Sequence, residues 1–160
     1  MRTEVGHFEG DLIIGAGDRS AVVTLVEQMS RYSFLGELPD GHDARSVLEC
    51  LTGLLERVPS ELRRTLSSDQ GREMARHHEL AEATGIDVFF AEPHHPWQRP
   101  SKKAFNGLVR RYVGKGTNLA IYGQGDLDAI SRRTNTIPRR IHNWRSAAEC
   151  YDPAVVAATG

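Results

Sequence analysis

An acidic residue interrupts an apolar stretch near the N-terminus, HFEGDLIIG at residues 7–15. Phe8 and the apolar residues 12–14 favour a buried β-strand, and Asp11 falls in its middle. A carboxylate in such a strand costs free energy unless a metal ion or another cation compensates its charge. Asp11 is therefore a candidate metal ligand, and a hydrogen bond to a nearby turn is the alternative explanation.

The residues on either side of this strand predict a mixed α/β order of elements. Runs rich in Val, Ile, Leu and Thr predict strands at 8–14, 20–29, 32–38, 65–68 and 86–91, with a hairpin turn at 15–19. Helical spacing and capping residues predict helices at 43–57, 72–84, 101–113 and 126–135. This order indicates a mixed five-stranded sheet with helices on both of its faces.

Length and composition fit one ordinary globular domain of 160 residues, with 39% hydrophobic and 26% charged residues. The apolar runs are too short to span a bilayer, and the N-terminus lacks the apolar run of a secretory signal. We therefore expect a cytoplasmic location and no membrane partner. Cys50 and Cys150 stand far apart without metal-site spacing, and we expect both to be reduced thiols.

Charge is distributed unevenly along the chain. The net charge is −1, yet residues 99–145 hold eleven basic and only two acidic residues, so the remaining residues carry a net −10. Clustered arginine and lysine suit phosphate contacts whatever the overall charge. The C-terminal third therefore predicts a polyanionic partner, and a solvated basic face is the alternative.

A second acid stands where the fourth predicted strand ends. Asp69 follows the run TLSS at residues 65–68 and precedes the predicted helix at 72–84. Asp69 is a second candidate metal ligand, and capping of that helix is the alternative role.

Five ordered motifs give these two acids a context: HFEGDLIIG at 7–15, LPDGH at 38–42, SDQGREMA at 68–75, PHHPWQR at 93–99 and NGL at 106–108. Together they resemble the DDE integrase core of the insertion-sequence-thirty family of bacterial transposases. The resemblance runs from about residue 5 to residue 149. It does not include the N-terminal helix-turn-helix region of full-length members.

This resemblance implies a ribonuclease-H-like fold and a catalytic triad of acids. The first acid falls at Asp11 and the second at Asp69, whereas the third, a glutamate 34 positions after the second, falls on Lys103. Where the family has RGTNENxNG, this chain reads RPSKKAFNG at residues 99–107. The motifs on both sides align without a gap, so the lysine stands at the position of the family glutamate.

The lysine matters because of the chemistry that the resemblance implies. Two divalent ions, Mg²⁺ or Mn²⁺, would be held by carboxylates, one ion activating the attacking hydroxyl and the other stabilising the leaving oxygen. Such hard cations prefer oxygen ligands, and an ammonium group has no lone pair to give. A protonated Lys103 is expected to repel a nearby divalent ion by several kcal/mol at an effective dielectric constant of about 20.

Three interpretations of Lys103 follow from the sequence. The chain belongs to a decayed element in which Lys102 and Lys103 still contact DNA. Alternatively, another acid completes the site, with Glu9 on the same strand face as Asp11 and Glu92 before the Pro-His loop as candidates. The third interpretation is a repurposed DNA-binding protein or an altered version of the enzyme.

The resemblance also indicates partners and an organisation. We expect double-stranded DNA, both transposon ends and target, as the partner of a homo-oligomer in the bacterial nucleoid, with residues 1–150 as catalytic core and 151–160 as a flexible tail. The candidate DNA contacts are Trp97, Gln98, Arg99, Lys102, Asn106, Arg110 and Arg111. A non-catalytic nucleic-acid-binding module and a ribonuclease-H-like nuclease of another kind are the rival functions.

Overall fold

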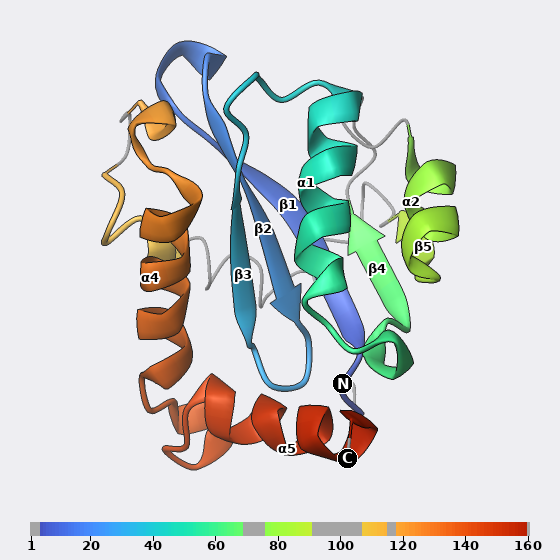
Figure 1. Ribbon diagram of the computed structural model, residues 1–160. Helices are drawn as coiled ribbons and strands as arrows, with labels where there is room; N and C mark the ends of the chain where they lie inside the picture. The colour runs from blue at the N-terminus through green and yellow to red at the C-terminus, as the bar shows by residue number, and fades with distance from the viewer. Residues whose placement is uncertain (1–3, 69–75, 91–106, 115–117, 160) are drawn as a thin grey trace.

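A computed structural model describes residues 4–68, 76–90, 107–114 and 118–159, and its centre is a five-stranded sheet in the order β3-β2-β1-β4-β5. The strands are β1 (His7–Ile14), β2 (Ala21–Glu27), β3 (Ser33–Glu37), β4 (Thr65–Ser68) and β5 (Asp87–Phe90). The first three strands pair antiparallel, and β4 and β5 run parallel to β1 (Figure 1). The predicted mixed sheet is confirmed.

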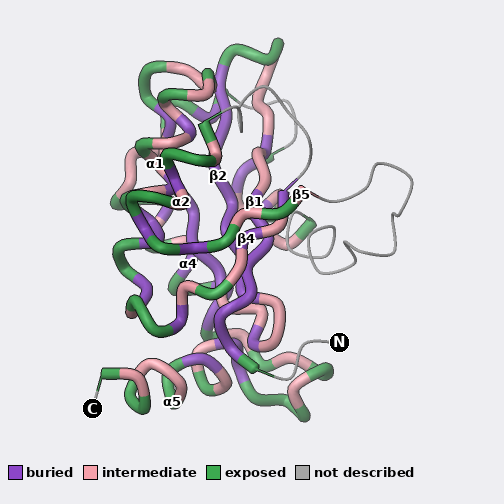
Figure 2. Tube along the Cα trace, turned by 90° about the vertical axis from the view of Figure 1, so that its right-hand side faces the viewer, coloured by how far each residue is buried: buried purple, intermediate pink, exposed green. Residues whose placement is uncertain are grey.

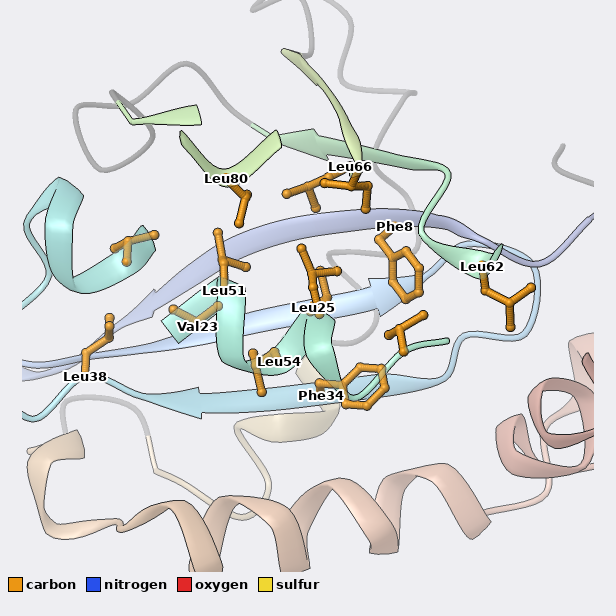
Figure 3. Close-up of a cluster of buried hydrophobic side chains, with 14 of the residues drawn as sticks. Phe8, Val23, Leu25, Phe34, Leu38, Leu51, Leu54, Leu62, Leu66 and Leu80 are labelled. Carbon is orange, nitrogen blue, oxygen red and sulfur yellow. The ribbon is translucent and has the colours of Figure 1, made fainter. Parts of the chain in front are cut away.

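Helix α1 (Ala44–Glu56) begins where the sequence predicts, because the Asp43 side chain accepts a hydrogen bond from the Ser46 main-chain nitrogen at 2.8 Å. Its buried side chains pack against the sheet in the hydrophobic cluster shown in Figure 3. At Gly36 of β3, an added Cβ would collide with the Cys50 sulfur of α1, so only glycine permits this close packing.

Apolar side chains cover both faces of the sheet. Val23 and Leu25 of β2 face α1, whereas Val22 and Val26 belong to a second cluster with Leu127 of α4. Since side chains alternate along a strand, the two clusters lie on opposite faces. Figure 2 shows buried residues concentrated along the strands and exposed residues on the outer sides of the helices.

Helix α4 (Gln124–Thr136) lies along β3, the edge strand (Figure 1). The Asn135 amide accepts from the Ser33 nitrogen at 2.8 Å and donates to the Ser33 oxygen at 3.0 Å. At the other end, the Gln124 amide accepts from the Glu37 nitrogen at 2.9 Å and donates to the Leu35 oxygen at 2.7 Å. Two side-chain amides thus satisfy main-chain groups that point outward from β3.

The turn between β2 and β3 is organised around a buried carboxylate. Glu27, which is 0% exposed, accepts hydrogen bonds from the main-chain nitrogens of Gly6, Met29 and Ser30 and from the Ser30 hydroxyl, at 2.7–3.1 Å. These four hydrogen bonds compensate the free-energy cost of removing the carboxylate from water.

The C-terminus differs from the prediction. Instead of a flexible tail at 151–160, helix α5 (Ala147–Thr159) continues to Thr159 and buries Tyr151 against Tyr32 and Phe34. The helix starts with a capping box, in which Ser146 and Glu149 exchange hydrogen bonds at 3.1 and 3.2 Å. The sequence predicted its last helix at 126–135, so α5 was missed.

The remaining helical predictions are met in part. Helix α2 (His77–Thr84) ends at Gly85, whose φ of 77° is the expected left-handed cap, and residues 72–75 of its predicted range lie outside the described residues. Of the predicted helix 101–113, only 107–113 are described, with helix at 107–109 and turn at 110–112. Short 3-10 helices lie at Ala16–Asp18, Ser60–Leu62, Leu119–Ile121 and Arg140–His142. No described helix is both long and apolar enough to cross a bilayer.

Candidate active site

Asp11 lies in the middle of β1, half-buried, on the sheet face that carries Ile13. It pairs with Thr24 of β2, whose hydroxyl donates to the Asp11 main-chain oxygen at 3.3 Å. The same face is covered by Val109 and Val113, each 1% exposed. Residues 107–113 therefore pack over the sheet face on which Asp11 lies.

The end of β4 lies beside Asp11. β4 runs parallel to β1, and Ser68, its last residue, pairs with Gly10, the residue before Asp11. Neighbouring strands are about 4.8 Å apart, so the main chain reaches position 69 from a point adjacent to Asp11. Asp69 itself lies outside the described residues.

Glu9 occupies the same face as Asp11, two residues earlier along β1. Two residues of strand span roughly 7 Å. Glu9 is 8% exposed and accepts a hydrogen bond from the Gln28 amide at 3.3 Å. Since side chains alternate along β1, the buried Glu9 carboxylate and the half-buried Asp11 carboxylate belong to the same face of the sheet.

Arg110 ties the segment 107–113 to the sheet. Its Nη2 donates to the main-chain oxygen of Ile14, at the end of β1, at 2.8 Å, whereas its Nη1 is buried without a hydrogen-bond partner among the described residues. The neighbouring Arg111 is exposed. The sequence predicts both arginines as phosphate contacts. It did not predict the hydrogen bond of Arg110 to Ile14, because the two residues lie 96 positions apart in the chain.

The other predicted site residues lie outside the described residues: Lys103, Glu92, Trp97, Gln98, Arg99, Lys102 and Asn106. Among residues 4–68, 76–90, 107–114 and 118–159, no group of three or more His, Cys, Asp or Glu side chains could hold a metal ion. A metal site that contains Asp11 would draw on positions beyond those ranges.

The two cysteines add no ligand to this region. Both are free thiols, as predicted. Burial, together with the negative charge of Glu37, raises the pKa of the Cys50 thiol to about 12, so it stays protonated at neutral pH. A protonated thiol is neither a good metal ligand nor a nucleophile.

Comparison with known proteins agrees with this geometry. Residues 3–96 match the integrase core domain family. The chain is 53% identical over 141 residues to the transposase for insertion sequence element IS1086 of Cupriavidus metallidurans, covering 88% of this chain and 41% of that protein. It is 40% identical over 154 residues to transposase InsI for IS30A of Escherichia coli, covering 96% of this chain and 40% of the relative.

A solved structure shows the same fold at low sequence identity. The catalytic core domain of BIV integrase superposes with a TM-score of 0.72 at 18% identity, covering 98% of this chain and 100% of that one. The present chain spans about two fifths of the length of the transposases it matches. The chain thus belongs to the integrase core domain family and is a core of the IS30 transposase type.

Proposed function

We propose that this chain is the catalytic core of a transposase that cleaves and joins DNA strands, with Asp11 and Asp69 as metal ligands. The pairing of Gly10 with Ser68 carries the proposal, because it brings the end of β4 beside Asp11. Asp69 directly follows Ser68 in the sequence, and we propose that its carboxylate and that of Asp11 bind the same metal ions.

The donor set suits Mg²⁺ or Mn²⁺, since both residues supply carboxylate oxygen. A pair of such ions would activate the attacking oxygen and stabilise the leaving one. The described contribution of the chain is to hold Asp11: main-chain hydrogen bonds to β2 and β4 fix β1 on both sides, and Arg110 bonds to the Ile14 oxygen at the end of β1.

Lys103 makes this copy a poor catalyst in our proposal. A lysine stands at the position of the family glutamate, and a protonated lysine close to divalent ions would oppose their binding. Val109 and Val113, which follow it in the sequence, are buried on the Asp11 face, and this supports the proposal. Glu9 is the described acid best placed to substitute for the family glutamate, since it shares the Asp11 face and is already buried.

DNA contacts complete the proposal. Arg111 is exposed beside Arg110 and is available to a phosphate. Trp97, Gln98, Arg99, Lys102 and Asn106 stay predictions, as does assembly of the core into a homo-oligomer that holds two DNA ends.

The decisive measurement is nicking of supercoiled plasmid in Mg²⁺ or Mn²⁺ by the parent chain, by Lys103→Glu and by Lys103→Glu/Asp69→Asn. We expect only Lys103→Glu to nick. Asp11→Asn in the Lys103→Glu background should also abolish nicking. Equal nicking by the parent and by Lys103→Glu would show that Lys103 does not disable the site, and loss on Glu9→Gln would then identify the substitute.

The second candidate is a DNA-binding module without catalysis. The lysine at position 103 favours it, since binding to phosphates needs no divalent ion. Salt-dependent binding by the parent and by Lys103→Glu, without nicking by either, would support this module and overturn the catalytic proposal.

A further inference from the structure

A compact loop between α4 and α5 presents a tryptophan to solvent. Two main-chain hydrogen bonds close the loop, from the Arg139 nitrogen to the Arg145 oxygen at 3.0 Å and from the Trp144 nitrogen to the Arg139 oxygen at 2.8 Å. His142 Nε2 anchors it to the Ser30 oxygen of the β2–β3 turn at 2.6 Å. The loop is therefore held in one shape against the end of the sheet.

The loop turns apolar side chains outward at a conformational cost. Trp144 is 63% exposed and Ile141 is 58% exposed. Asn143 and Trp144 have φ of 53° and 70°, a left-handed region that a bulky residue such as tryptophan rarely adopts. Strain of this kind persists where the surrounding structure enforces it and is concentrated at functional sites.

The loop that carries the tryptophan also carries three arginines, at positions 139, 140 and 145. The Arg140 guanidinium lies 5.7 Å from the centre of the Trp144 ring, and Arg145 is exposed in the same loop. Burial, with the nearby positive charge of Arg31, lowers the pKa of Arg139, so two of these cations repel each other. Within the described part of the chain, no carboxylate forms an ion pair with Arg31, Arg139, Arg140 or Arg145.

The described loop thus carries arginines that have no carboxylate ion pair, and one of them, Arg140, lies beside an exposed aromatic ring. Arginine binds phosphate oxygens in pairs of hydrogen bonds, and an aromatic ring packs against sugar or base. An acidic protein surface would also satisfy the charge, but an exposed tryptophan beside arginines favours a nucleic acid, which offers both phosphates and rings for stacking.

We infer that the loop of residues 139–145, with Arg31, binds the phosphate backbone of double-stranded DNA at a second place, the end of the sheet where β2 turns into β3. Figure 1 shows the α4–α5 connection at the end of the sheet where β2 turns into β3. The inference deepens the proposed function, on which it rests for the identity of the DNA as substrate. Arg139 is partly occupied by the Thr134 oxygen at 2.9 Å, so Arg140 and Arg145 are the main contacts.

The test is fluorescence anisotropy of a labelled DNA duplex, in EDTA, with the parent chain and the double variant Arg140→Ala/Arg145→Ala. EDTA separates this binding from metal-dependent nicking. Each phosphate contact adds about 0.9 to the slope of log affinity against log salt, so we expect the slope to fall by about 2 and the affinity to fall about tenfold at roughly 50 mM salt.

The matched control is Arg45→Ala/Arg76→Ala, which removes the same charge from arginines paired with Glu49 and Glu79. It should bind within about twofold of the parent, since both arginines are exposed and each already has a carboxylate partner. Trp144→Ala should weaken binding, and Trp144→Phe should retain most of it. Circular dichroism melts check that each variant is folded.

A direct readout uses the Trp97→Phe chain, in which Trp144 is the only remaining tryptophan. Its emission should change on addition of duplex in EDTA. The inference would be overturned if the Trp144 emission stayed unchanged while anisotropy showed that the duplex binds. It would also be overturned if the two double variants lost the same amount of DNA affinity. The inference would also be overturned if Arg140→Ala/Arg145→Ala changed the molecular mass measured by sedimentation but not the affinity for DNA. That result would identify the loop as a protein–protein contact. If DNA binding depends on Arg140 and Arg145 but no variant nicks plasmid DNA, the inference about the loop stands and only the proposed catalysis is refuted.

Discussion

Glu27 shows how a single residue can organise a turn. Three of the four hydrogen bonds that Glu27 accepts are buried, and the fourth, from the Met29 nitrogen, is partly buried. Nothing in the sequence separates this acid from the exposed ones, because its donors Gly6 and Ser30 lie on either side of it and converge only in the folded chain.

We predict that Glu27→Ala lowers the free energy of unfolding by about 2–3 kcal/mol, because it leaves buried donors unpaired. Glu27→Gln should cost about 1 kcal/mol, since the amide keeps one acceptor oxygen but turns a donor toward the Gly6 nitrogen. Urea denaturation measures both. Glu82→Ala on the exposed side of α2 is the control. A Glu27→Ala loss as small as that of the control would refute the assigned role.

At the scale of elements, the strands were predictable and one helix was not. Strands of β-branched and apolar residues, such as β2, give a clear local signal, and all five were placed to within two residues. Helix α5 consists largely of small residues and contains Pro153, so its amphipathic signal is weak. The signal was nevertheless present, as the Ser146–Glu149 capping box and the helical spacing of the core-facing residues Tyr151, Ala154, Val155 and Ala158.

We predict opposite effects of two substitutions in α5. Tyr151 stacks on Tyr32 at 4.2 Å, yet its hydroxyl is buried without a hydrogen-bond partner among the described residues. Tyr151→Phe should therefore raise the free energy of unfolding by up to about 1 kcal/mol, because an unpaired polar group is removed. Tyr151→Ala should lower it by about 3 kcal/mol through loss of packing.

Thermal and urea denaturation of the two Tyr151 variants distinguish a docked helix from a tail. If α5 did not pack on the core, both substitutions would be neutral. Ser146→Ala serves as a second check on the helix and should cost about 1 kcal/mol through loss of the cap.

At the scale of the whole molecule, the candidate site depends on contacts between distant segments. The residues Asp11 and Asp69 were recognisable from motifs, but the pairing of β1 with β4 and the Arg110 contact to Ile14 are non-local and leave no local trace in the sequence. The sequence therefore names Asp11 and Asp69 as candidate acids, whereas the contacts that hold β1 and its Asp11 in place emerge only from the folded chain.

In the proposed function the site binds divalent ions only in the folded chain, so metal binding should raise the stability of the whole molecule. A ligand that binds only the folded chain at tenfold above its dissociation constant adds about 1.4 kcal/mol, or roughly 3–5 °C in melting temperature. We expect Mg²⁺ or Mn²⁺ to produce such a shift in Lys103→Glu and none in the parent, measured by calorimetry with EDTA as reference.

The control for that measurement is Arg45→Glu, which changes the net charge equally on the exposed surface of α1. It should show no metal-dependent shift. A shift of the parent as large as that of Lys103→Glu would mean that an ammonium group at position 103 does not oppose the ions.

The two amides of α4 on the edge of β3 have a consequence for solubility. An uncovered edge strand is a template on which further strands can add, the first step toward aggregation. Gln124 and Asn135 occupy that template at both ends of β3, leaving little for a foreign strand to pair with. At the β3 edge, another copy of the chain would contact α4 instead of unpaired main-chain groups. Addition of a strand from a second molecule is therefore blocked at this edge.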